Sequence, residues 1–243
     1  MAHKLYYSID GYYDATVVAG GSFDQSDNSF TVSDGSQVTN EANINSNSIT
    51  DTVISVDFGG VKTIDFIANY HSVADTNDLF FYSSNSSAAS YSERGSIFSS
   101  AIGWNVTEFT EATNRYWALR SQDGTFDGMH EVIMGVSLNL QQPDMGAVEE
   151  EVYSTHYNEA YSGTQYSNKI DQPRTRWTLN FSFVDSDLKT GLELFQNTVQ
   201  NKFKFIYYDE SSYHYVRLVS PLQFTQVAGA VFTTQIILEE QFQ

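Results

Sequence analysis

Cysteine is absent from the 243 residues, and proline occurs only three times. Without cysteine, neither a disulfide nor a thiolate metal site can stabilise the fold, so the hydrophobic core must supply that stability. Basic residues are scarce as well, since 12 Lys and Arg stand against 30 Asp and Glu, a formal net charge of -18. A chain this acidic repels phosphate backbones and anionic lipid surfaces, so we expect neither nucleic acid nor a membrane among its partners.

Long apolar runs are also missing. No stretch approaches the roughly 20 apolar residues that a membrane span requires, and residues 1–18 contain no apolar region of the length found in signal peptides. We therefore expect synthesis in the cytoplasm without signal-directed secretion.

The composition that remains favours a folded β protein. Hydrophobic residues make up 41% of the chain and charged residues 17%, which excludes a disordered acidic tail. Aromatics reach 15%, and Thr and Val recur in short runs separated by Ser, Asn, Asp and Gly. This mixture predicts a mainly β fold, and the length suits two β-sandwich or barrel-like domains.

The first half of the chain contains several short β-rich runs. The clearest two, residues 53–58 and 62–69, flank Gly59-Gly60, and a glycine pair between β-rich runs predicts a tight hairpin. Further strands are predicted at residues 79–82 and 115–120.

A second domain is expected to begin near residue 130, where apolar residues alternate through residues 132–140 as in a half-buried strand. We thus divide the chain into domains 1–129 and 130–243. Residues 143–173 are acidic and Tyr-rich without a clear period, so they form either an extended interaction arm or strands that periodicity does not reveal.

The end of the chain has the clearest periodicity. Residues 174–183 (RTRWTLNFSF) place Trp177, Leu179, Phe181 and Phe183 on one face of a strand. An amphipathic helix follows at about 186–201, and three more strands fit residues 203–208, 213–219 and 231–239.

Motifs for catalysis or cofactor binding are not found. No two of the five histidines have metal-ligand spacing, and the sequence contains no GxSxG, GxxxxGK[ST] or GxGxxG segment. We therefore expect no enzyme activity and no cofactor. Two alternatives stay open, a glycosidase built on two of the 30 acids and calcium binding in the acidic loops 24–27, 75–78 and 123–127. Turn formation explains those loops more simply than a metal does.

Four tyrosines of the 143–173 segment lie among polar residues, where amphipathic tyrosines are typical of protein interfaces. We expect this arm to contact another subunit through Tyr153, Tyr157, Tyr161 and Tyr166.

The C-terminal segment of about 70 residues resembles β-domains in tail proteins of long-tailed bacteriophages. In that pattern an Arg-x-Arg-aromatic strand leads into a short helix, and the strands that follow carry an aspartate-bearing turn, an arginine, a Ser/Thr-Pro step and a final Leu-Glu-Glu. In this sequence the corresponding residues are Arg174, Arg176, Trp177, Asp209, Arg217, Ser220, Pro221, Leu238, Glu239 and Glu240. The resemblance adds Arg174 and Arg176 to the expected interface.

A second resemblance concerns the N-terminal domain. ISVDFGGVKTIDFIANYHS and the later NRYWALRSQDG look like the discoidin or galactose-binding-like jelly roll, with Asp57-Phe58-Gly59, Ile64, Ile67 and Arg115 to Arg120 in the matching places. Many such domains bind sugars, so a host-surface glycan is an expected partner of this domain.

Together these features predict a non-enzymatic virion protein of a phage tail or tail tip that assembles into an oligomeric ring. Its expected partners are copies of itself, other tail proteins and a host glycan. The alternative is a carbohydrate-binding module, and a glycan-degrading tail enzyme is a third hypothesis.

Overall fold

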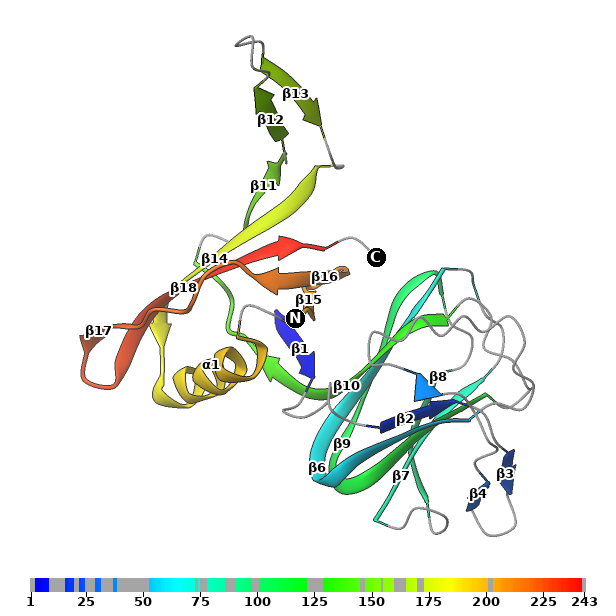
Figure 1. Ribbon diagram of the computed structural model, residues 1–243. Helices are drawn as coiled ribbons and strands as arrows, with labels where there is room; N and C mark the ends of the chain where they lie inside the picture. The colour runs from blue at the N-terminus through cyan, green and yellow to red at the C-terminus, as the bar shows by residue number, and fades with distance from the viewer. Residues whose placement is uncertain are drawn as a thin grey trace. The chain divides into compact units, whose positions relative to one another are not determined.

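The computed structural model describes residues 3–8, 16–19, 22–24, 29–31, 37–38, 53–72, 74, 78–85, 91–97, 101–121, 129–144, 147–153, 155–159, 165–169, 173–200 and 203–241. These residues are mainly β with one α-helix, as the composition predicts (Figure 1). The chain divides into an N-terminal unit, Tyr6–Ser137, and a C-terminal unit, Met1–Leu5 with Leu138–Gln243. Within the described part, no helix is long and apolar enough to cross a membrane.

The N-terminal unit is built on two long antiparallel strands, β6 (Val53–His71) and β9 (Gly103–Ser121). β10 (Met129–Asn139) pairs with the free side of β6, and β7 (Leu79–Ser84) with β8 (Ser92–Ile97) extends the sheet beyond β9. Short strands complete the unit: β2 (Thr16–Ala19), β3 (Ser22–Asp24), β4 (Ser29–Thr31) and β5 (Gln37–Val38). β2 pairs with β5 and β6, and β3 with β4.

The core of this unit lies on one face of β6, β9 and β7. Ile64, Ile67, Leu79, Phe81 and Trp117 are fully buried in one hydrophobic cluster. In-register partners such as Val56 and Trp117 point to the same face, so neighbouring strands contribute to one cluster. Ile64 and Ile67 are three positions apart, and the register of β6 and β9 shifts between Ile64 and Phe66, which interrupts the period of two there.

The predicted hairpin at Gly59-Gly60 is wrong. β6 continues through both glycines, and both of its halves pair with β9, because Asp57 lies opposite Tyr116 and Lys62 opposite Asn114. The extra β6 residues form a bulge, and Gly59 has a φ of +69°. A positive φ serves a bulge as well as a turn, so the glycine pair alone did not distinguish the two.

The C-terminal unit contains an antiparallel sheet in the order β11, β14, β18, β16, β15. These strands span Val148–Val152, Arg174–Val184, Val231–Glu240, Tyr213–Leu218 and Phe205–Tyr208 respectively. β17 (Thr225–Ala228) pairs with β18, and β12 (Thr155–Glu159) with β13 (Gln165–Lys169) forms a sheet of two strands. β1 (Lys4–Ser8) and β10 cross the division between the two units.

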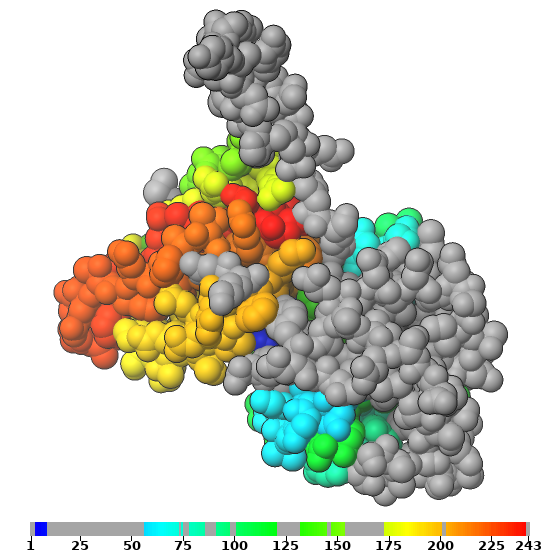
Figure 2. Space-filling model, in the orientation of Figure 1, coloured from blue at the N-terminus to red at the C-terminus, as the bar shows by residue number. Residues whose placement is uncertain are grey.

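Helix α1 (Ser186–Val199) begins after Asp185, whose carboxylate accepts a hydrogen bond from the Leu188 N–H at 2.8 Å. Its apolar stripe buries Leu192, Phe195 and Val199, as its periodicity predicts. α1 and the β17–β18 hairpin lie side by side at the surface (Figure 2), where Lys189 Nζ lies 5.3 Å from the Phe224 ring and 5.2 Å from the Phe232 ring. This cation–π contact holds the hairpin against the helix.

For residues 143–173 we expected either an extended interaction arm or strands without a clear period. The segment contains three strands, β11, β12 and β13. β11 pairs with β14 through five consecutive positions. The sequence did not predict β11 as a strand because its three successive glutamates remove the alternation of apolar and polar residues. All residues from Val148 to Glu151 are exposed.

Candidate functional site

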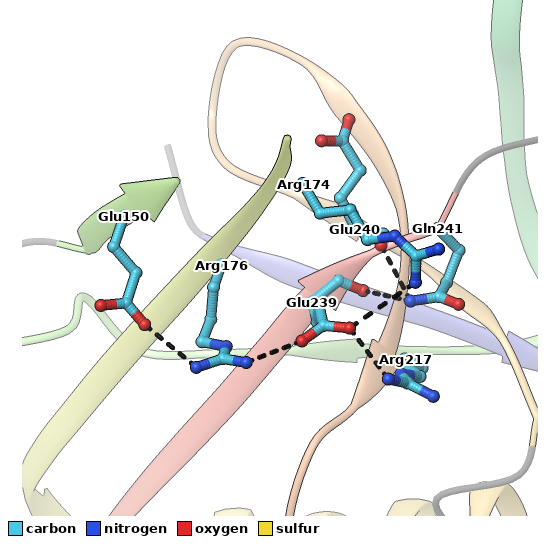
Figure 3. Close-up of polar contacts among 7 residues, drawn as sticks. All are labelled: Glu150, Arg174, Arg176, Arg217, Glu239, Glu240 and Gln241. Atoms are coloured by element: carbon cyan, nitrogen blue, oxygen red, sulfur yellow. Dashed lines mark hydrogen bonds and ion pairs between the residues drawn. The ribbon is translucent and has the colours of Figure 1, made fainter. Parts of the chain in front are cut away.

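The C-terminal unit presents a row of four alternating charges that crosses four neighbouring strands. Glu150 of β11 lies opposite Arg176 of β14, Arg176 lies opposite Glu239 of β18, and Glu239 lies opposite Arg217 of β16. Directly opposed residues of antiparallel strands share a face, so all four side chains lie on one side of the sheet (Figure 3). We call Glu150, Arg176, Glu239 and Arg217 the charged row.

Glu239 is the centre of this row. Its carboxylate oxygens lie 2.8 Å from Arg176 Nη2 and 2.9 Å from Arg217 Nη2, and Arg174 Nη1 lies 3.8 Å away. Only 8% of the Glu239 side chain is exposed, whereas 46% of Arg217 and 56% of Glu150 are. Three guanidinium groups therefore cover one carboxylate, and the outer members of the row face solvent.

Electrostatics keeps Glu239 ionised. Burial acts to raise the pKa of this carboxyl, but the hydrogen bonds from Arg176 and Arg217 outweigh it and hold the pKa below the ordinary 4.5. Arg176 also donates to Glu150 at 3.2 Å, so its guanidinium joins two carboxylates on different strands. The arrangement is suited to fastening strands or binding charged groups, because an arginine neither gains nor loses a proton at physiological pH.

An apolar row runs beside the charged row on the same face. Each of its members is two positions from a member of the charged row. The four lie side by side and are Val148, Thr178, Ile237 and Val219. Val148 is 57% exposed and Val219 is 37% exposed. We call these four residues the apolar row, and the face that carries both rows the outer face.

The opposite face of the sheet is the core, with Trp177, Leu179 and Phe181 buried. Phe183 was predicted to join them, and this is wrong, because it is 71% exposed. A bulge between Phe181 and Val184 inserts one residue into β14, so Val184 takes the buried position. The bulge turns Phe183 to the outer side.

A second polar group lies at the turn between β15 and β16. The Asp209 carboxylate accepts from the Ser211 and Ser212 N–H groups and lies 2.8 Å from His214 Nε2. Burial opposes ionisation, but these hydrogen bonds hold the pKa of Asp209 well below its usual value. The His214 ring packs 4.6 Å from Trp177, so this group anchors the turn to the core.

His3 forms a buried hydrogen bond, with its Nδ1 2.7 Å from the hydroxyl of Tyr207. Burial lowers the pKa of His3 below 6.5 against the opposing effect of Glu210 and Asp209. The His3 carbonyl also accepts from the Leu140 N–H, so both groups fasten the start of the chain within the C-terminal unit.

The two segments that carry the galactose-binding-like resemblance meet in the N-terminal unit. The Arg115 guanidinium donates twice to Asp57, with Nε at 2.7 Å from Oδ1 and Nη2 at 2.9 Å from Oδ2. The Arg115 hydrogen bonds outweigh burial and lower the pKa of Asp57. Arg115 also lies 4.8 Å over the Tyr116 ring. Ile64 and Ile67, the other residues of the resemblance, are core residues.

The predicted interface residues fall into two groups. Arg174 and Arg176 lie together at Glu239, while Tyr153 is 53% exposed and donates its hydroxyl to Glu151. Tyr157 belongs to β12 and Tyr166 to β13, but their side chains lie outside the described part, and Tyr161 lies outside it altogether. The described residues thus place the two predicted arginines at Glu239, and the tyrosine contacts stay a prediction.

Calcium remains an expectation. Most of the acidic loops 24–27, 75–78 and 123–127 lie outside the described residues. Within the described ranges, no three His, Cys, Asp or Glu side chains are placed to hold a metal ion.

No protein-family model matches this sequence, and no curated protein sequence matches it. Solved structures with local similarity include the GH89 CBM32-5 of Clostridium perfringens in complex with GalNAc-β-1,3-galactose, at 10% identity and a TM-score of 0.37 over 52% of this chain and 98% of that one. Chitosan-binding module 1 of a Paenibacillus chitosanase/glucanase gives 12% identity and a TM-score of 0.36 over 56% and 99%.

A Ruminococcus gnavus GH29 fucosidase in complex with fucose gives 14% identity and a TM-score of 0.35 over 51% of this chain. This chain spans only 25% of that fucosidase. The similar structures thus include carbohydrate-binding modules, and none of these three is a phage protein. At these identities and TM-scores the similarities assign neither a family nor a function.

Proposed function

We propose that the chain is a non-enzymatic structural protein that presents a carbohydrate-binding domain from a self-assembling base, as part of a phage tail or tail tip. In this proposal the C-terminal unit associates with copies of itself and with other tail proteins. The N-terminal unit faces outward and binds a host-surface glycan. The virion is the corresponding location.

The observation that carries the proposal is the convergence around Glu239. Arg174, Arg176, Arg217 and Glu239 are four of the residues on which the tail-protein resemblance rests, and they are separated by as many as 65 positions in the chain. Three strands bring them into one network on an exposed face. A solvent-facing arginine network is a common element of protein interfaces, where Arg is enriched.

The edge strand β11 adds to this support. Among the described residues, β11 pairs with β14 on one side, and all but the last of its residues are exposed. An exposed strand edge is a template for another chain unless something covers it.

Purified protein at rising concentration tests the assembly. Size-exclusion chromatography with light scattering and negative-stain electron microscopy should detect oligomers, since repetition of one contact in a closed arrangement gives a defined stoichiometry. A monomer at every concentration, with no binding to tail extracts, would reject it.

Carbohydrate binding by itself is the second candidate function. The observation that favours it is the Asp57–Arg115–Tyr116 group, because carboxylate, guanidinium and aromatic side chains are the types that recognise sugar hydroxyls and rings. A glycan array that includes galactose, GalNAc-β-1,3-galactose and chitotriose tests it. Binding by a chain that stays monomeric would favour this function over the structural one.

A further inference from the structure

The outer face of the C-terminal unit has a pattern that restricts which partner it can take. The charged row reads Glu150, Arg176, Glu239, Arg217 across the sheet, which is minus, plus, minus, plus. The apolar row beside it reads Val148, Thr178, Ile237, Val219. An alternating row with an even number of members is complementary to itself when reversed.

One particular two-fold axis presents the row of a second copy in reversed order. An axis that runs parallel to the strands, midway between β14 and β18, places each row on its own copy in the opposite order. Glu150 then faces the partner's Arg217, and Arg176 faces the partner's Glu239. In the apolar row Val148 faces the partner's Val219, and Thr178 faces the partner's Ile237.

A two-fold axis parallel to the rows brings like charges together or leaves charges unpaired. A two-fold axis that runs along the charged row places Glu150 on the partner's Glu150 and Arg176 on the partner's Arg176, and like charges in direct apposition are strongly unfavourable. An axis midway between the two rows places charged residues on the apolar row of the partner and leaves their charges unpaired. Two-fold contacts use the same patch on both copies, so the charge order favours the strand-parallel axis over an axis parallel to the rows. The selected axis also keeps the strands of the two copies aligned, which is a standard geometry of sheet packing.

We propose that the outer face binds the outer face of a second copy about this strand-parallel axis. The inference rests on the proposed self-association and names the surface and the partner. β14 and β18 with the shorter β11 and β16 give a footprint of roughly 500 Å² a copy, or about 1,000 Å² in total, which is the lower limit for a specific interface. The dimer is therefore weak by itself and forms at high local concentration.

Cross-linking tests the geometry directly, because the natural chain has no cysteine. Val148→Cys and Val219→Cys change exposed side chains at opposite ends of the apolar row. In the proposed dimer these two positions lie across the interface at about 10 Å, while within one chain they lie three strand spacings, about 14 Å, apart. A bismaleimide that spans about 10 Å should join the two variants when mixed.

Neither variant alone should cross-link to the same extent. In the proposed dimer, position 148 of one copy lies at the opposite end of the row from position 148 of the other copy, and the same holds for position 219. Leu194→Cys mixed with Val219→Cys is the matched control, since Leu194 is 59% exposed but lies on α1. Equal cross-linking in the control mixture, or stronger cross-linking of one variant with itself, would overturn the proposed axis.

A charge exchange provides the second test. Arg217→Glu places a glutamate against the partner's Glu150, and Glu150→Arg places an arginine against the partner's Arg217, so each variant alone should dimerise about tenfold more weakly. Mixing them restores opposite charges at both contacts, so native mass spectrometry should find the 1:1 heterodimer. Failure of the mixture to exceed either variant would overturn the inference.

These outcomes separate the inference from the proposed function. If the natural chain self-associates but the mixed variants neither cross-link nor recover, the outer face is not the contact and the assembly proposal stands. If the natural chain remains monomeric throughout, both are rejected.

Discussion

Glu239 is the residue on which the charged row depends, because its carboxylate lies against three guanidinium groups while almost wholly shielded from water. Its neighbours at the ends of the row keep solvent contact and lose little when unpaired. The loss of one partner in a buried ion network leaves the others with an uncompensated charge.

Glu239→Gln should therefore destabilise the fold by about 3 kcal/mol, since the amide keeps the shape of the side chain but removes its charge. Urea unfolding followed by circular dichroism measures this. Glu193→Gln is the control, because Glu193 pairs with Lys189 on the exposed side of α1, where an ion pair contributes at most about 0.5 kcal/mol. Equal losses in both variants would show that the network does not stabilise the fold.

The pH dependence follows from the depressed pKa of Glu239. A carboxyl whose pKa is lower in the folded state stabilises the fold above its ordinary pKa of 4.5 and loses that contribution as pH falls through its folded pKa. The difference in unfolding free energy between the natural chain and Glu239→Gln should be constant from pH 6 to 7 and shrink below about pH 4.5. A difference that stays constant down to pH 3 would contradict the assignment.

At the scale of single strands and their partners, a close approach between two backbones restricts which residue a position can hold as strongly as charge does. A Cβ added at Gly135 of β10 would lie 1.9 Å from the carbonyl oxygen of Tyr7 in β1. The strand pair therefore accepts only glycine at this position.

Gly135→Ala should destabilise the protein by about 2 kcal/mol or more, because backbone has to move to admit the methyl group. The matched control is Gly60→Ala, where a Cβ would meet nothing within 4 Å. Thermal unfolding of the two variants gives the comparison, and a Gly135→Ala melting temperature as high as that of Gly60→Ala would refute the close approach.

Elements were predictable from the sequence where the apolar period was regular. The strands of residues 79–82, 115–120, 174–183, 213–219 and 231–239, and the helix after Asp185, are confirmed. Bulges defeated the prediction twice. At Gly59-Gly60 the extra residues of β6 have the composition of a turn, so a hairpin was predicted there. At Phe183 one extra residue reverses the face of the side chains that follow, and local composition does not reveal it.

The candidate site was predictable only in part, for a similar reason. Arg174 and Arg176 were identified by resemblance, but their convergence with Arg217 on Glu239 depends on strand register between segments some 65 positions apart. The detectable signal was a glutamate at an alternating position of the last strand, where an apolar residue is the ordinary choice for a shielded site. Register itself has no local signature in a sequence.

At the scale of the whole molecule, the acidic balance and the local clustering of arginine have different consequences. A formal charge of -18 keeps separate copies apart at long range, and salt screens that repulsion with a Debye length of about 8 Å at physiological ionic strength. Contacts on the outer face act at closer range. Self-association should therefore strengthen as salt rises from about 10 to 150 mM, until screening also weakens the facing ion pairs.

Sedimentation equilibrium at several salt concentrations measures this dependence. A dissociation constant that rises steadily from the lowest salt would contradict long-range repulsion between acidic copies, since attraction between opposite charges would then dominate at every distance.

The central claim is that this chain assembles with copies of itself through its C-terminal unit. The most direct measurement is sedimentation velocity of the purified full chain from about 1 to 500 µM, a range that covers the affinities expected of small interfaces. The account predicts a concentration-dependent shift from monomer to a discrete oligomer, and weakening of that shift by Arg217→Glu. A single monomeric species over the whole range would contradict it.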